Sequence, residues 1–119
     1  MINNLIVISD THCGDQLAIC PPKITYVNGG SYQYSKFQEA IWNCWNEFWD
    51  EWVPRATRNE PFAVLFNGDM VEGVHHGASH PISQNKADQA NIAYEVLSPV
   101  VDKANGRFYY VSGSRAHAA

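Results

Sequence analysis

The chain has 119 residues, of which 45% are hydrophobic and 17% are charged. This composition is typical of one small folded domain, or part of one, and excludes both a disordered chain and two independent domains. Eight Lys and Arg against twelve Asp and Glu give a net charge of −4, and the basic residues form no cluster. Tight nucleic-acid binding through phosphate neutralisation alone is therefore not expected.

The cysteines and the longest apolar run bear on the compartment. Cys13, Cys20 and Cys44 are odd in number and irregularly spaced, which argues against a disulfide framework and against a Cys-rich zinc site. The run from Leu5 to Ile8 is far too short for a signal-peptide core or a membrane span. We therefore expect a cytoplasmic protein without a membrane partner, with residues 1–119 forming a single, incomplete domain.

The first predicted elements are a strand and a hairpin. Leu5 to Ile8 is a continuous, β-branched apolar run, as expected for a strand buried on both faces of a parallel sheet. Residues 24–27 and 31–34 flank the turn sequence Asn28-Gly29-Gly30, whose glycines permit positive φ. This pattern predicts a β-hairpin inserted after the first strand.

A helix is predicted from about Lys36 to Trp52. Ser35 followed by Gln38 has the spacing of a capping box, and Pro54 is expected to help end the helix. Apolar residues at helical spacing form a stripe that we assign to the core: Phe37, Ile41, Cys44, Trp45, Phe48 and Trp52. On a flanking stripe are Trp42 and Trp49, for which covering the hairpin or the sheet is favoured over stacking on nucleic-acid bases.

The second half of the chain predicts two strands around a helix. Residues 62–66 form an apolar strand, residues 85–104 a helix with a break at Ser98-Pro99, and residues 107–111 a third strand. Gly106 marks the C-terminal end of the helix. The order β-α-β-α-β predicts an α/β fold with a parallel sheet.

Polar clusters follow each predicted strand. They are Asp10-Thr11-His12, Gly68-Asp69, and residues 113–117. The carboxyl ends of parallel strands line one edge of a sheet, where ligands bind, so these clusters are expected to converge.

The residue types in the first two clusters are those of metal ligands. Asp10 and His12, two positions apart, would point to the same side of an extended segment and could coordinate one ion, and a second Asp from the adjacent strand could bridge two ions. Either pair alone is more often explained by a helix cap or a turn than by a metal site. The occurrence of both pairs, each directly after a buried strand, favours a metal site.

With these motifs the sequence resembles the calcineurin-like metallophosphoesterase superfamily, and most of all its phage-type members. Asp10-Thr11-His12 and Gly68-Asp69 match the first two family motifs, and the hairpin, the Trp-rich helix and residues 71–76 are also similar to that subgroup. The resemblance covers the whole chain. It implies half of a four-layer α/β/β/α sandwich, in which the family adds a second sheet against the first.

The resemblance also implies a mechanism. Asp10 and His12 would hold one metal ion and Asp69 would bridge it to a second, the ions being Mn, Fe, Zn or Ni. A hydroxide between the two ions would attack phosphorus and hydrolyse a phosphomonoester or phosphodiester, with a nucleotide or nucleic acid among the expected substrates.

The third family motif, Gly-Asn-His, is altered in this sequence. Ser114 stands at the Asn position and would be a neutral oxygen ligand, and His117 would be a general acid, a metal ligand or a tail residue without function. For each of the histidines after the second motif, His75, His76 and His80, the alternatives are a contact with a metal ligand, a contact with the substrate phosphate and an exposed position in the loop. His76 is expected at the metal site, and His80 is expected to be exposed.

Two later His-containing motifs of the family have no counterpart in the chain. The sequence therefore leaves three alternatives: a metal-dependent phosphoesterase, a non-catalytic half-domain that binds metal or docks a partner, and a truncated, inactive product. A partner, a second subunit or a C-terminal half is expected to cover the open sheet face. The number of tightly bound ions separates the enzyme from the other two.

Overall fold

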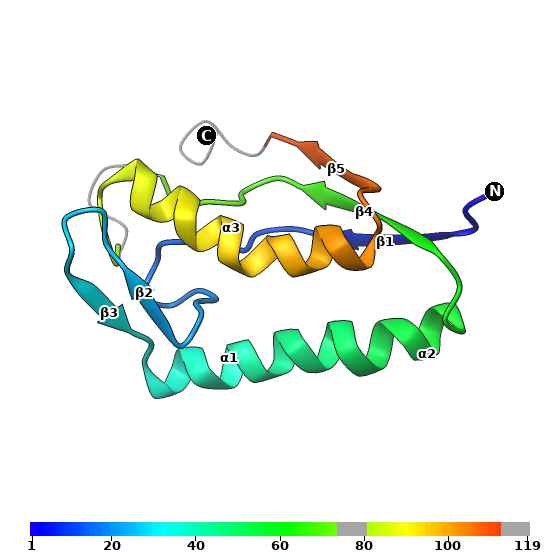
Figure 1. The fold of residues 1–119 in the computed structure, drawn as a ribbon, viewed down its shortest axis with the longest axis horizontal. Helices are drawn as coiled ribbons and strands as arrows, with labels where there is room; N and C mark the ends of the chain where they lie inside the picture. Colours follow the sequence, from blue (N-terminus) through cyan, green and yellow to red (C-terminus); the bar gives the residue numbers. More distant parts are fainter. Residues whose placement is uncertain (74–80, 113–119) are drawn as a thin grey trace.

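The computed structural model describes residues 1–73 and 81–112, and its centre is a three-stranded parallel sheet. The strands are β1 (Asn4–Ile8), β4 (Phe62–Asn67) and β5 (Phe108–Val111), in the order β1-β4-β5. Ile6 of β1 is opposite Val64 of β4, and Leu65 of β4 is opposite Tyr109 of β5. The predicted parallel α/β arrangement is confirmed, with β4 in the centre (Figure 1).

The predicted hairpin is also present, with shorter strands than expected. β2 (Lys23–Thr25) and β3 (Ser31–Gln33) pair antiparallel. Gly29 adopts a φ of 94°, and the amide of Gly30 donates to the side chain of Asn28. The turn therefore depends on the backbone freedom of glycine, as the sequence indicated.

The first long helix runs further than predicted. It consists of α1 (Lys36–Glu47), the π-helical segment η1 (Phe48–Trp52) and α2 (Val53–Thr57), and the Ser35–Gln38 capping box is formed. Pro54 does not end the helix, because it stands in the first turn of α2, where proline is tolerated. The helix ends instead at Arg58, whose φ of 57° is left-handed.

The core assignment along this helix is partly wrong. Trp49 is only 3% exposed, whereas Phe37 and Trp52 of the predicted core stripe are 58% and 49% exposed, and Cys44 is also exposed. The amide of Val53 donates to the carbonyl of Phe48, five residues back, and this π turn changes the direction of the side chains from Trp52 onward relative to a regular α-helix. Trp49, which we predicted on a stripe flanking the core, is instead a buried core residue.

The second long helix, α3 (Lys86–Lys103), is continuous, so the predicted break at Ser98-Pro99 is wrong. Pro99 lies on the exposed side of the helix, while Val96 and Val100 on the other side are 1% exposed. Packing of this apolar side against the core maintains the helix despite the hydrogen bond that proline cannot donate. The helix ends as predicted near Gly106, which has a φ of 81°.

The sheet is covered on one face within the described residues. Ile6, Val64 and Phe66 are buried with the apolar sides of the helices. Side chains on the opposite face of β1 and β5 are exposed by 49–59%: Leu5, Val7, Tyr109 and Val111. The prediction that the first strand is buried on both faces is therefore wrong for Leu5 and Val7, and the expected open apolar face is present among the described residues.

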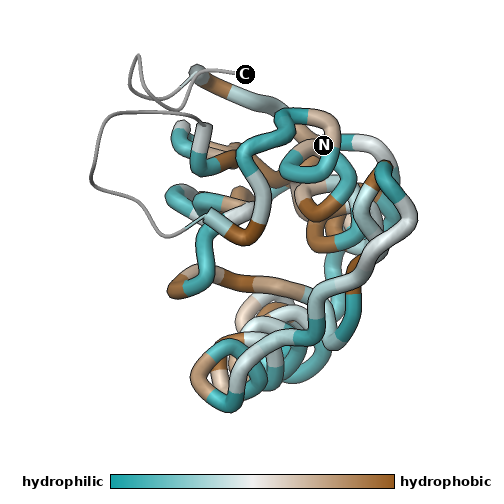
Figure 2. Tube along the Cα trace, turned by 90° about the vertical axis from the view of Figure 1, so that its left-hand side faces the viewer, coloured by the Kyte–Doolittle hydropathy of each residue, from teal (hydrophilic) through white to brown (hydrophobic). Residues whose placement is uncertain are grey.

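The two long helices pack on the same face of the sheet. In Figure 1 the α1–η1–α2 helix runs below α3 and the sheet, and Figure 2, turned by 90°, shows that helix end-on below the rest of the chain. An ion pair of 2.9 Å between Lys103 and Asp50 joins the two helices. This arrangement leaves the carboxyl ends of β1 and β4 open to one side.

Candidate metal centre

Three candidate ligands meet at the carboxyl ends of β1 and β4. Asp10 and His12 follow β1, and Asp69 follows β4. One ligand atom from each of the three side chains lies within 4.8 Å of the other two. Because β1 and β4 are adjacent and parallel, residues nearly sixty positions apart in sequence reach one small volume, as the motif spacing led us to expect.

The backbone at the three residues is left-handed. Asp10, His12 and Asp69 have φ values of 58°, 43° and 58°. The extended conformation that we expected for residues 10–12 is therefore wrong, and the Asp and His side chains converge through a tight left-handed path. Such a conformation costs a residue with a Cβ about 1–2 kcal/mol. Three such residues at one sheet edge fit the tendency of strained backbone to cluster at functional sites.

Hydrogen bonds between the two loops hold this conformation in place. The amide of Asp10 donates to the carbonyl of Gly68 at 3.0 Å, and the amide of His12 donates to the carbonyl of Asp69 at 3.1 Å. The hydroxyl of Thr11 donates to the carbonyl of Met70 at 2.8 Å. The parallel pairing of β1 and β4 thus continues into the loops and fixes the two motifs against each other.

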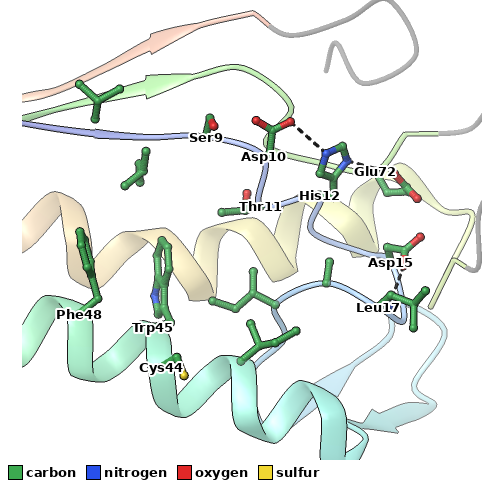
Figure 3. A pocket seen from close by; sticks show the side chains of 15 residues that line it. Ser9, Asp10, Thr11, His12, Asp15, Leu17, Cys44, Trp45, Phe48 and Glu72 are labelled. Carbon is green, nitrogen blue, oxygen red and sulfur yellow. Dashed lines mark hydrogen bonds and ion pairs between the residues drawn. The ribbon is translucent and has the colours of Figure 1, made fainter.

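The imidazole of His12 lies between two carboxylates (Figure 3). Its Nε2 atom is 3.2 Å from Asp10 Oδ1, and its Nδ1 atom is 3.3 Å from Glu72 Oε1. Glu72 is only 6% exposed. When Nδ1 donates to Glu72, Nε2 keeps its lone pair on the side of Asp10, which is the tautomer that a metal ligand needs.

Glu72 was missed as a site residue by sequence reasoning. The signal in the sequence that could have indicated Glu72 is its position three residues after Asp69. The parallel β-bridge between Cys13 and Val71 extends the pairing of the two segments beyond the strands, and it places the side chain of Glu72, the next residue, beside His12. The amide of Glu72 also donates to the carbonyl of Cys13 at 2.9 Å. Glu72 therefore belongs with the site as the residue that orients His12.

The site is electrostatically suited to a cation. A hydrogen bond with the Ser9 side chain is the main cause that lowers the pKa of Asp10, and hydrogen bonds with His12 and Asp69 lower it further. The carboxylate is therefore ionised at neutral pH. With Asp69 and Glu72 nearby, the site gathers three carboxyl groups around one imidazole, and a bound cation would be stabilised by the ionised Asp10 carboxylate and these further oxygen donors.

The donor set matches a divalent metal ion. Two carboxylate oxygens and one imidazole nitrogen suit Zn, Mn, Fe or Ni, and the separations of the three atoms are compatible with shared coordination of one ion. Among residues 1–73 and 81–112, Asp10, His12 and Asp69 form the group of three His, Cys, Asp or Glu side chains whose ligand atoms lie close enough to share one ion. The role of Asp10, His12 and Asp69 as ligands stays a prediction.

The remaining predicted site residues lie outside the described part of the chain. These are Ser114 and His117 of the third motif and the loop histidines His75, His76 and His80. Cys13, next to His12, is fully buried, and burial raises the pKa of its thiol to about 12. This thiol is therefore protonated at neutral pH and is not a metal ligand in this state.

Comparison with protein-family models, with curated proteins and with solved structures finds no match to this chain. Within the described residues no helix has the length and apolar character needed to cross a membrane.

Proposed function

We propose that this chain is the metal-binding half of a metallophosphoesterase domain and takes part in metal-dependent hydrolysis of a phosphoester. The observation that carries the proposal is the convergence of Asp10, His12 and Asp69 at the ends of two adjacent parallel strands. The open sheet face, with Leu5 and Val7 exposed, supports the finer proposal of half a four-layer α/β/β/α sandwich.

The residues of this chain would bind and orient the metal ions. Asp10 and His12 would hold the first ion and Asp69 would bridge it to a second, while Glu72 would fix the tautomer and orientation of the His12 ring. When bound, divalent ions lower the pKa of water and stabilise negative charge on a phosphoryl group. The left-handed loops keep the carboxylates in position before the metal binds.

A second candidate function is a half-domain that binds metal without catalysis. It is favoured by one observation: the described residues supply three donor side chains, which are sufficient for one ion. Ser114, His117 and His76 would have to supply further ligands in the catalytic alternative.

Metal binding by matched variants tests the proposal. Isothermal titration with Mn²⁺ should show binding to the parent protein, near-complete loss of binding in Asp69→Asn, and about ten- to a hundredfold weaker binding in Glu72→Gln, since loss of a group that orients a ligand typically has this effect. Asp102→Asn on the exposed side of α3 makes the same chemical change away from the site and should bind normally. Undiminished binding by Asp69→Asn would remove this residue from the site.

Activity separates the two candidate functions. With Mn²⁺ and bis(p-nitrophenyl) phosphate, the phosphoesterase proposal predicts slow turnover that Asp69→Asn abolishes. Metal binding without any turnover would instead favour the non-catalytic half-domain.

A further inference from the structure

A cavity of about 850 Å³ opens beside the candidate metal centre. Asp10, His12 and Glu72 lie at its polar end. The cavity then extends along β1 toward the α1–η1 helix, as the close view of its lining side chains shows (Figure 3). Its volume lies in the range of small-molecule binding sites, about 300–1,000 Å³.

The walls away from the metal centre are apolar and aromatic. Trp45 and Phe48 point from the helix toward β1 in Figure 3. Aliphatic side chains line the remaining wall: Ile8, Leu17, Ile19 and Ile41. This end of the cavity therefore offers flat aromatic surfaces and no group that requires a charged ligand.

The aromatic wall is held rigid by the buried Trp49. The Trp45 ring is 5.6 Å from the Trp49 ring, and the Phe48 ring is 5.0 Å from it, both in edge-to-face geometry. Phe48 also stacks on Trp52 with a centroid distance of 5.0 Å. Aromatic surfaces that are fixed before binding lose little conformational entropy when a ligand packs on them.

The charges of the cavity define which part of a ligand fits where. Among the residues that the structure describes, the ionisable side chains in the lining are Asp10, His12, Asp15 and Glu72, together with the thiol of Cys44, and none of these lining residues is Lys or Arg. An anionic group would thus lose its hydration without compensation at the apolar end, whereas a metal ion at the polar end would attract it.

We propose that this cavity binds the planar, uncharged ring of the phosphoester, a nucleobase or an aryl group, with the phosphate at Asp10, His12 and Asp69. This inference rests on the proposed phosphoesterase function and names its substrate class. Esters that carry an aromatic ring should be preferred over small aliphatic phosphates, because the aromatic wall can bury a ring next to the metal centre.

Cys44 provides a reporter for the cavity that needs neither metal nor catalysis. Its thiol is exposed and lines the cavity, whereas Cys13 and Cys20 are buried and their pKa values are raised to about 12 by burial. Iodoacetamide at pH 8 should therefore alkylate Cys44 selectively, and a ring bound in the cavity should slow this reaction.

The experiment measures Cys44 alkylation by mass spectrometry in EDTA, with adenosine, phenol or ribose as the probe. We expect millimolar adenosine to slow alkylation severalfold and ribose to have no effect. Protection by phenol as well would show that any planar ring is accepted, and protection by adenosine alone would assign a nucleobase.

Two variants and a control locate the binding. Trp45→Leu should abolish the protection, while Phe37→Leu, at an exposed position of the same helix outside the cavity lining, should retain it. Ala18→Leu adds volume at another residue of the cavity lining and should also weaken protection, which covers the case in which Trp45→Leu does not fold.

The proposal would be overturned if neither adenosine nor phenol slowed the alkylation of Cys44. It would also be overturned if the Trp45→Leu and Ala18→Leu variants were protected as strongly as the parent protein. Protection in EDTA without metal-dependent hydrolysis would support the ring site and contradict the phosphoesterase function. Metal-dependent hydrolysis without protection of Cys44 would support the phosphoesterase function and contradict the ring site.

Discussion

Replacement of Asp69 by glycine and by alanine separates the backbone cost of the metal centre from the chemistry of its carboxylate. Both variants lack the ligand, but only glycine adopts the φ of 58° without a steric penalty. The left-handed conformation costs alanine about 1–2 kcal/mol, and the greater freedom of glycine in the unfolded chain offsets about 0.5–1 kcal/mol of this advantage. Asp69→Gly should therefore be more stable than Asp69→Ala by about 1 kcal/mol.

Urea denaturation in EDTA measures this difference, and a melting temperature higher by about 4 °C should accompany it. Ala90, exposed on α3, provides the opposite control, since Ala90→Gly in a helix should destabilise the protein by about 1 kcal/mol. Neither Asp69 variant should gain stability from added Mn²⁺, whereas the parent protein should. If Asp69→Ala were as stable as Asp69→Gly, residue 69 would not be held in the left-handed conformation and the strain argument would fail.

Two further predictions concern stability. Gln38 is fully buried, and its side chain donates hydrogen bonds to the carbonyls of Asp15 and Ala18 and accepts two more. Each bond contributes about 1 kcal/mol and most of them would be lost, so Gln38→Leu should lower the free energy of unfolding by about 3 kcal/mol. An unchanged urea midpoint would contradict this prediction. Burial raises the pKa values of the Cys13 and Cys20 thiols from 9.0 to about 12, so the folded state binds more protons than the unfolded state and stability should fall as the pH rises from 9 to 12. A double Cys→Ala variant should show a shallower alkaline decline in a pH series of urea titrations, and an identical decline would refute the contribution of the thiols.

The strands and the helix start at Ser35 could be predicted because their signals are local. A β-branched apolar run defines β1, and the capping box depends on two residues three positions apart. The effects of Pro54 and Pro99 could not be predicted in this way. Pro54 is tolerated because a π turn precedes it and places it in the first turn of α2, and Pro99 is tolerated because packing of α3 against the core outweighs the missing hydrogen bond.

The candidate metal centre was predictable in its residues and less so in its geometry. Asp10, His12 and Asp69 have types and positions that indicate a site after parallel strands. Their left-handed backbone and the contact of Glu72 with His12 depend on hydrogen bonds between two loops about sixty residues apart, and no local pattern in the sequence encodes these bonds.

The π-helical segment explains how one helix keeps a straight apolar edge. Trp45, Trp49, Val53 and Thr57 recur at intervals of four residues, and the last three are buried. In a regular α-helix, four residues advance about 40° beyond a full turn, so an edge with this period would drift around the helix axis. The wider turn at Phe48–Trp52 counteracts the drift, because its hydrogen bonds span five residues. Trp45 and Phe48, three residues apart at the start of this turn, line the cavity, whereas Trp49 is buried in the core. The wider turn therefore keeps the buried edge of the helix aligned directly after the aromatic wall of the cavity.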